Sequence, residues 1–304
     1  QTVRRPTLGA RPYTSLTEVG YFRGIVATYA LNRRLTMTLL ASRIRRDANG
    51  DSSGIGLVAT SLQTSGLHRT QSERDDQGSL METNLGAHLL YQNRHQLQLG
   101  LTLLSTTYDL FFQKRSQAYN AYEFTGTHNL VVGVHGGYIW RNWNLFAELA
   151  RSSGSVTNSG GIGLVGGALV SLTKKLDMAV VVRHYDRNFH SFYGNAFSEG
   201  SRNINEEGAY LGLKYTIYRK LTVGGFVDYF NFPWLKYLVD KSSNGFDYLL
   251  QVRYTPNRQT TFYGVYHEEH KQKNLTVDKR KDVVGTTRRS YALNAEYTLV
   301  RGLS

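Results

Sequence analysis

The sequence contains no cysteine, which excludes disulfide bonds and any metal centre built on thiolates. It has only 4 prolines in 304 residues, which suits many paired strands, because proline removes a backbone donor from a sheet. Long hydrophobic runs are also missing, since glycines interrupt the longest apolar stretch, 162–172. A transmembrane helix needs about 18 consecutive apolar residues, so none is expected here.

Glycine, tyrosine and positive charge are abundant instead. The chain has 30 Gly, 21 Tyr and a formal net charge of +13. Two readings of the basic excess are open: contact with anionic lipid headgroups, or a path for nucleic acid or an anionic substrate. The chain begins at Gln1 and shows no signal peptide, so we expect either a removed leader or an internal portion of a longer chain.

Apolar and polar residues alternate with a period of two along many segments, which is the pattern of a β-strand. In the segment 209–217, Leu211, Leu213 and Tyr215 share one face, and Lys214 lies on the other. The same alternation runs through 144–152, 176–185, 248–255 and 290–298. Each segment has about 9–12 residues, the length that a tilted membrane strand requires.

The polar faces of these segments carry charges of both signs. In a membrane barrel such residues line the lumen while the apolar face meets lipid. We therefore predict an all-β fold, an antiparallel outer-membrane β-barrel with roughly 14–16 strands in a single domain 1–304. We expect further strands to be missing at one or both ends of this domain. A soluble β-sandwich is the alternative. The predicted lumen-lining residues are Glu148, Arg183, Lys214, Asp228, Asp247, Arg253, Glu268 and Glu296.

Short turns alternate with long loops along the chain, as in barrels with short periplasmic turns and long external loops. The short turns centre on 32–34, 92–94, 141–142, 173–175, 218–220 and 256–258. The predicted long external loops lie near 109–121, 186–206, 232–244 and 270–285, and residues 1–18 are read as a first strand or as a plug or linker. Tyr and Trp near the strand ends are typical of an interfacial aromatic girdle.

Several loop motifs follow one another in an order that resembles a known family. They are Gly66–Glu73, Tyr122–Gly126, Phe146–Ser152, Asn195–Ser201, Asn205–Gly208 and Phe232–Tyr237. Together they resemble the barrel region of a Bacteroidota outer-membrane family whose members often carry N-terminal helix-hairpin-helix repeats. The resemblance implies further strands on either side. No helix-hairpin-helix segment occurs in these residues, so DNA binding through that module is not carried over.

Two clusters have the residue types of an active site. His190 and Ser191 could form a nucleophilic pair, but neighbouring residues on a strand point to opposite faces. The motif His267-Glu268-Glu269-His270 spaces its histidines three apart in a strand, whereas the helical zinc motif spaces them four apart. We therefore predict no catalysis, no metal site and no cofactor.

The apolar cluster Phe232, Pro233, Trp234 and Leu235 lies in a long loop and is a candidate either for partner contact or for folding over the barrel mouth. The functional prediction is an outer-membrane channel, or a subunit of a larger envelope transport or secretion complex. The alternatives are a rim-located lipid hydrolase and a sealed scaffold barrel linked to nucleic-acid uptake. Expected partners are the lipid bilayer, lipopolysaccharide and envelope proteins, with nucleic acid left open.

Overall fold

The computed structural model describes residues 9, 11–14, 20–53, 56–63, 66–93, 96–156, 159–277 and 280–298. Apart from the short helices α1 (Gln71–Asp75) and η1 (Ala118–Asn120), the described elements are strands. They are β1 (Gly24–Ala30), β2 (Leu35–Arg46), β3 (Ala48–Ser53), β4 (Gly56–Leu62), β5 (Leu80–Asn93), β6 (Leu97–Gln113), β7 (Thr125–Trp140), β8 (Trp143–Gly154), β9 (Ile162–Thr173), β10 (Leu176–Tyr185), β11 (Glu206–Tyr218), β12 (Leu221–Phe232), β13 (Ser243–Tyr254), β14 (Thr260–Val277) and β15 (Arg280–Tyr297). In this described part of the chain, no helix is both long and apolar enough to cross a bilayer.

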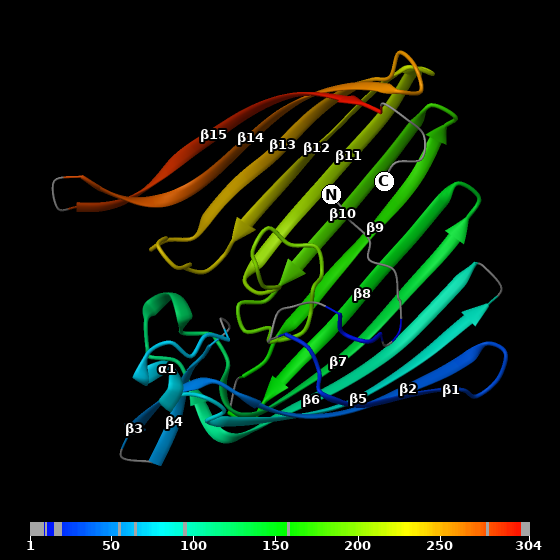
Figure 1. Ribbon diagram of the computed structural model, residues 1–304. Helices are drawn as coiled ribbons and strands as arrows, with labels where there is room; N and C mark the ends of the chain where they lie inside the picture. Colours follow the sequence, from blue (N-terminus) through cyan, green and yellow to red (C-terminus); the bar gives the residue numbers. More distant parts are fainter. Residues whose placement is uncertain are drawn as a thin grey trace. The chain divides into compact units, whose positions relative to one another are not determined.

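Apart from β3 and β4, the strands form one antiparallel sheet in which each strand pairs with the next one along the chain (Figure 1). The order is β1-β2-β5 and then every strand in turn to β15, while β3 and β4 lie off this path. β3 pairs with β4, and β4 adds to β6 in parallel through Val58–Phe111 and Ala59–Phe112. This meander of hairpins confirms the predicted all-β antiparallel fold, and its 15 strands fall within the expected range.

Asparagine side chains close two of the short turns. Asn32 Oδ1 accepts hydrogen bonds from the backbone N–H groups of Arg34 and Leu35, 2.8 and 3.0 Å away. Asn257 Oδ1 does the same for Gln259 and Thr260, at 2.9 and 2.8 Å. Asn favours such turns because its side chain mimics a backbone carbonyl two residues on. These contacts reverse the chain between β1 and β2 and between β13 and β14, where the sequence predicts short turns.

Burial follows the predicted alternation. In β12, Val227 and Tyr229 are 52% and 51% exposed, whereas Asp228 and Phe230 are 2% and 1% exposed. The same reversal of the usual inside and outside appears in β13, where Leu250 is exposed and Asp247 is buried. Apolar side chains that face outward while charged ones are enclosed match a sheet whose outer face meets hydrocarbon.

Two predicted loops are partly wrong. β6 continues to Gln113, so residues 109–113 are strand, and the connection to β7 covers 114–124. The loop predicted at 270–285 is largely an extension of β14 and β15, which pair without interruption from Thr260–Tyr297 to Val277–Arg280. The polar residues of this extension, such as Lys271 and Asp282, do not alternate with apolar ones. Backbone pairing of two strands does not depend on such an alternation, so the sequence pattern missed this extension.

The chain divides into two compact units, so the single domain 1–304 stays a prediction. The first unit contains 1–138, 146–165 and 184–205, and the second contains 139–145, 166–183 and 206–304. The segment 1–18 falls largely outside the described residues. Its described residues, 9 and 11–14, belong to no strand.

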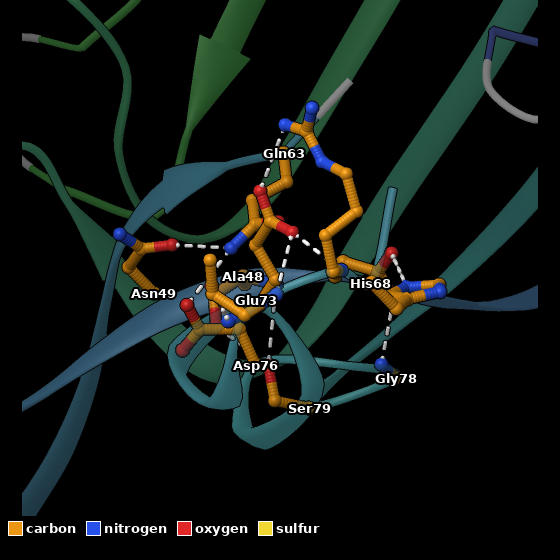
Figure 2. Close-up of polar contacts among 11 residues, drawn as sticks. Ala48, Asn49, Gln63, His68, Glu73, Asp76, Gly78 and Ser79 are labelled. Carbon is orange, nitrogen blue, oxygen red and sulfur yellow. Dashed lines mark hydrogen bonds and ion pairs between the residues drawn. The ribbon is translucent and has the colours of Figure 1, made fainter. Parts of the chain in front are cut away.

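In the first unit, residues 47–79 form a small lobe of β3, β4 and α1 between β2 and β5. Figure 2 shows its polar contacts: Gln63 Nε2 donates to Asn49 and to Asp76, each at 2.8 Å, and the Ser79 hydroxyl donates to the Ala48 carbonyl at 2.7 Å. Thr70 and Glu73 cap α1 reciprocally. The lobe packs on a cluster of Ala48, Ala59, Leu80, Tyr108, Phe112 and Phe124.

Candidate functional site

The first unit contains an open cavity of about 1680 Å³. Its walls are the inner faces of strands, represented by Thr38, His88 and Glu148. The N-terminal residues Tyr13 and Phe22 and a stretch of the β10–β11 connection complete the lining. The cavity is therefore bounded by the N-terminal segment and by a loop as well as by the sheet.

The β10–β11 connection, residues 186–205, turns toward the strand wall, and we call it the inner loop. Its base is narrow, since Asn205 N donates to the Asp186 carbonyl at 3.1 Å. Asp186 Oδ2 in turn accepts from Ile162 N at 2.7 Å, which ties the base to β9. Asn205 has a φ of 53°, in the left-handed region that asparagine tolerates better than most residues. The external loop predicted at 186–206 is thus a loop, but one that lines a cavity.

Tyr193 anchors one side of the inner loop. Its hydroxyl donates to Glu82, which is buried on β5, and accepts from Arg46 Nη2 on β2 at 2.8 Å. Asn84 Nδ2 also donates to Glu82, at 2.6 Å. Burial and the neighbouring Glu82 carboxylate raise the pKa of Tyr193 to about 12, so this hydroxyl stays protonated at neutral pH. The anchor therefore persists over the physiological pH range.

His190 anchors the other side. The Asn129 side chain on β7 donates to the His190 carbonyl at 3.0 Å, and His190 N donates to the Ser152 hydroxyl on β8 at 2.9 Å. The imidazole ring packs edge-on against Phe124, with 5.8 Å between centroids. Asn129 and Ser152 are each 1% exposed, so the backbone of the loop supplies hydrogen bonds that these buried groups require.

Burial lowers the pKa of His190 to about 4, while Glu123 raises it and Arg202 lowers it. The unfolded chain binds this proton near pH 6.5 and the folded loop does not, so stability falls as the pH falls from about 6.5 to about 4. We predict that wild type loses up to about 3 kcal/mol of unfolding free energy over this window relative to His190→Gln.

Denaturant unfolding in detergent at pH 7 and pH 4.5 measures this difference. His184→Gln is the matched control, because His184 is a half-exposed histidine just before the loop. Equal pH dependence in wild type and His190→Gln would show that the ring titrates freely in the folded protein.

The second unit contains a buried ionic triad. Arg183 Nε donates to Glu206 at 2.6 Å, and its two terminal nitrogens donate to the two carboxylate oxygens of Asp228 at 2.7 and 3.1 Å. The Arg183 and Glu206 side chains are fully buried, and that of Asp228 is 3% exposed. A bidentate guanidinium–carboxylate pair is the geometry that offsets the cost of removing such charges from water. Here the triad joins β10, β11 and β12.

The other predicted lumen residues are spread over both units. Asp247 Oδ1 accepts a hydrogen bond from His267 Nε2 at 2.5 Å, and Glu268 accepts from Arg289 Nε at 2.7 Å and from the Tyr248 hydroxyl at 3.0 Å. Glu148 lies on the cavity wall of the first unit. The remaining three, Lys214, Arg253 and Glu296, are exposed. The set predicted as one lining is therefore several groups, and its lumen assignment stays a prediction.

The two enzyme-like clusters take different forms. Ser191 lines the cavity, whereas the His190 ring lies against Phe124, and no hydrogen bond joins the two side chains in the described structure. His267 pairs with Asp247, while the His270 ring stacks on Phe246 at 5.2 Å. Among the described residues, no group of three or more histidine, cysteine, aspartate or glutamate side chains could hold a metal ion.

The four residues of the apolar cluster 232–235 differ in burial. Phe232 is buried at the end of β12 against Phe230, 5.7 Å between centroids, with Lys236 Nζ 3.2 Å from its ring centre. Pro233 is exposed, and Trp234 and Leu235 are half-buried. Partner contact by this loop stays a prediction. Its most exposed apolar residues are instead Tyr237 and Leu238, 71% and 63% exposed.

No family model and no curated protein matches the chain. Among solved structures it is similar to the ferric enterobactin receptor (PfeA) from Pseudomonas aeruginosa, with a TM-score of 0.50 and 9% identity over 91% of this chain and 48% of that one. The chain thus spans about half the length of that receptor. It has the fold of an outer-membrane β-barrel.

Two further likenesses are to smaller barrel proteins. The NanC porin has a TM-score of 0.31 and 13% identity, covering 72% of this barrel chain and 94% of the porin. OmpT of Vibrio cholerae has a TM-score of 0.34 and 9% identity, covering 88% and 99%. At these identities the likeness extends to the barrel fold alone.

The sequence reasoning missed the residues that hold the inner loop. Tyr193, Glu82 and Asn129 were not singled out, although Glu82 and Asn129 are polar residues at inward positions of otherwise apolar-alternating strands. That signal marks a buried polar position in a barrel strand, but it does not identify the partner. The partner of Glu82, Tyr193, comes from a loop more than 100 residues away in the chain.

Proposed function

We propose that the protein is an outer-membrane channel that admits small solutes, with the inner loop 186–205 narrowing the passage. The observation that carries this proposal is the cavity of about 1680 Å³, bounded by inward strand faces and by an inward-turned loop. Barrels with an aqueous interior conduct solutes, and groups that project into that interior set what passes.

The outward faces support placement in the outer membrane. Leu, Val and Tyr side chains are exposed on β11, β12 and β13. Their exposure to water costs free energy, whereas a hydrocarbon environment matches them. Lipid and lipopolysaccharide are the partners that this surface and the basic turns favour. Membership of the Bacteroidota family that the loop motifs resemble, and assembly into a larger envelope complex, belong to the same proposal.

The proposal includes no catalysis. A serine hydrolase needs its base within hydrogen-bond reach of the nucleophile, and the His190 ring is directed toward Phe124 instead. Lipid hydrolysis that is lost in His190→Ala would favour the hydrolase alternative.

The test is reconstitution of the purified protein into planar bilayers and membrane fractionation of expressing cells. We expect recovery in the outer-membrane fraction, migration that changes on heating in detergent gels, and discrete conductance steps. A folded, membrane-inserted protein that gives no conductance would be a sealed scaffold, and a protein that stays folded in plain buffer would not be a membrane barrel.

A further inference from the structure

The lining of the cavity in the first unit points to a class of solute. We propose that this cavity binds and passes short uncharged oligosaccharides, an inference that rests on the proposed channel function.

The lining is poor in charge. Of the described residues that line the cavity, only Arg11 and Glu148 are of the types Asp, Glu, Lys and Arg, although these four types make up 19% of the chain. An ion that leaves bulk water for such a wall finds few opposite charges to replace its hydration, and this cost is large. A neutral solute does not incur it. Phosphorylated or carboxylated sugars and peptides with free termini are therefore disfavoured.

The lining is rich in neutral hydrogen-bonding groups. The hydroxyls of Thr28 and Thr38 lie 3.0 Å apart on β1 and β2, and Thr102 lies 2.8 Å from His88 Nδ1 on β5. The inner loop adds serine and asparagine side chains, namely Ser191, Asn195, Ser198, Ser201 and Asn203. Hydroxyl and amide groups both donate and accept, as sugar hydroxyls do.

Flat aromatic rings complete the lining. Tyr13 and Tyr21 stack with 4.1 Å between centroids, Phe22 lies 4.3 Å from Tyr193, and Phe146 projects from β8. Ring faces provide apolar contact for the C–H faces of a pyranose. Tyr193 is held through its hydroxyl by Glu82 and Arg46, so its ring is fixed before a ligand arrives, and less conformational entropy is lost on binding.

The volume selects a solute of several sugar units. Pockets for drug-sized ligands measure about 300–1,000 Å³, and this cavity measures about 1680 Å³. It has room for an oligosaccharide together with water, and the aromatic and hydrogen-bonding groups lie on walls contributed by different segments.

The experiment measures blockade of single-channel current by trisaccharides of matched size: uncharged maltotriose, anionic trigalacturonate and cationic chitosan trimer. We expect concentration-dependent blockade by maltotriose and at least about tenfold weaker blockade by the charged trimers. Phe146→Ala is expected to weaken the maltotriose effect roughly threefold to tenfold, because it removes one ring face. Leu149→Ala is the control, since Leu149 lies on the exposed face of the same strand.

Open channels that maltotriose does not block, or that a charged trimer blocks equally well, overturn the inference and leave the channel function standing. If the inserted protein gives no conductance, the channel function fails, and calorimetric titration of the detergent-purified protein with maltotriose then tests the site. Saturable heat that Phe146→Ala reduces and Leu149→Ala does not would support binding, and absence of heat would refute it.

Discussion

Replacement of residues 188–203 by a short glycine linker is expected to raise the single-channel conductance at least about twofold, because it removes the inner loop from the passage. The strands should be little affected, since the Asp186–Asn205 hydrogen bond at the base of the loop is retained. Glu82, Asn129 and Ser152 lose their loop partners, but water in the widened lumen can hydrate them.

Conductance in planar bilayers measures this change. A shortened β12–β13 loop, with residues 234–241 replaced by the same linker, is the control, because no residue of that loop lines the cavity in the described structure. An unchanged conductance after removal of 188–203 would mean that the passage is limited elsewhere.

A smaller change separates the anchor from the loop itself. Tyr193→Phe keeps the ring but removes the hydroxyl between Glu82 and Arg46. If the anchor holds the loop in place, this variant should show more frequent transitions to higher conductance. The residues that line its cavity are otherwise the same as in wild type.

Arg183→Met is expected to destabilise the protein by about 3–5 kcal/mol, the typical cost of leaving buried carboxylates without their cation. Glu206 and Asp228 would then lie buried side by side without the guanidinium that now binds both. Denaturant titration in detergent micelles, with folded protein measured by gel migration, detects a change of this size.

Three variants place the effect on the triad. Lys214→Met removes an exposed charge and should change stability by no more than about 0.5 kcal/mol. Gly208→Ala should be destabilising without removing any charge, because its new Cβ would lie 2.5 Å from Arg183 Cζ. Replacing all three triad residues by apolar ones should recover much of the loss. If Arg183→Met is as stable as wild type, the two carboxylates reach water.

Strand positions and faces followed from the sequence because a barrel strand alternates strictly. The exposed Leu211, Leu213 and Tyr215 and the buried Asp228 all lie on the faces that the pattern predicts. The short turns were equally readable, since Asn32 and Asn257 close them through contacts two and three residues away. Both the alternation and the turns depend only on residues that are close together in the chain, so they can be read from the sequence.

The extent of the strands beyond the apolar pattern was not readable. Residues 270–277 and 280–285 are mostly polar and show no period-two alternation, so they resemble a loop, yet their backbones pair with each other. The connection between β2 and β5 forms a lobe of β3, β4 and a short capped helix, and the sequence pattern did not predict that helix.

The sequence alone determined the all-β barrel fold, the order of its main hairpins and the alternation of apolar and polar faces, because period-two alternation and turn chemistry act over a few residues. Tertiary structure alone decided which polar residues meet. The joining of Tyr193 to Glu82 and of Arg183 to Glu206 and Asp228 depends on strand register and on a loop that turns inward. Contacts between residues far apart in the chain leave no periodic signal, so only the folded sheet brings them together.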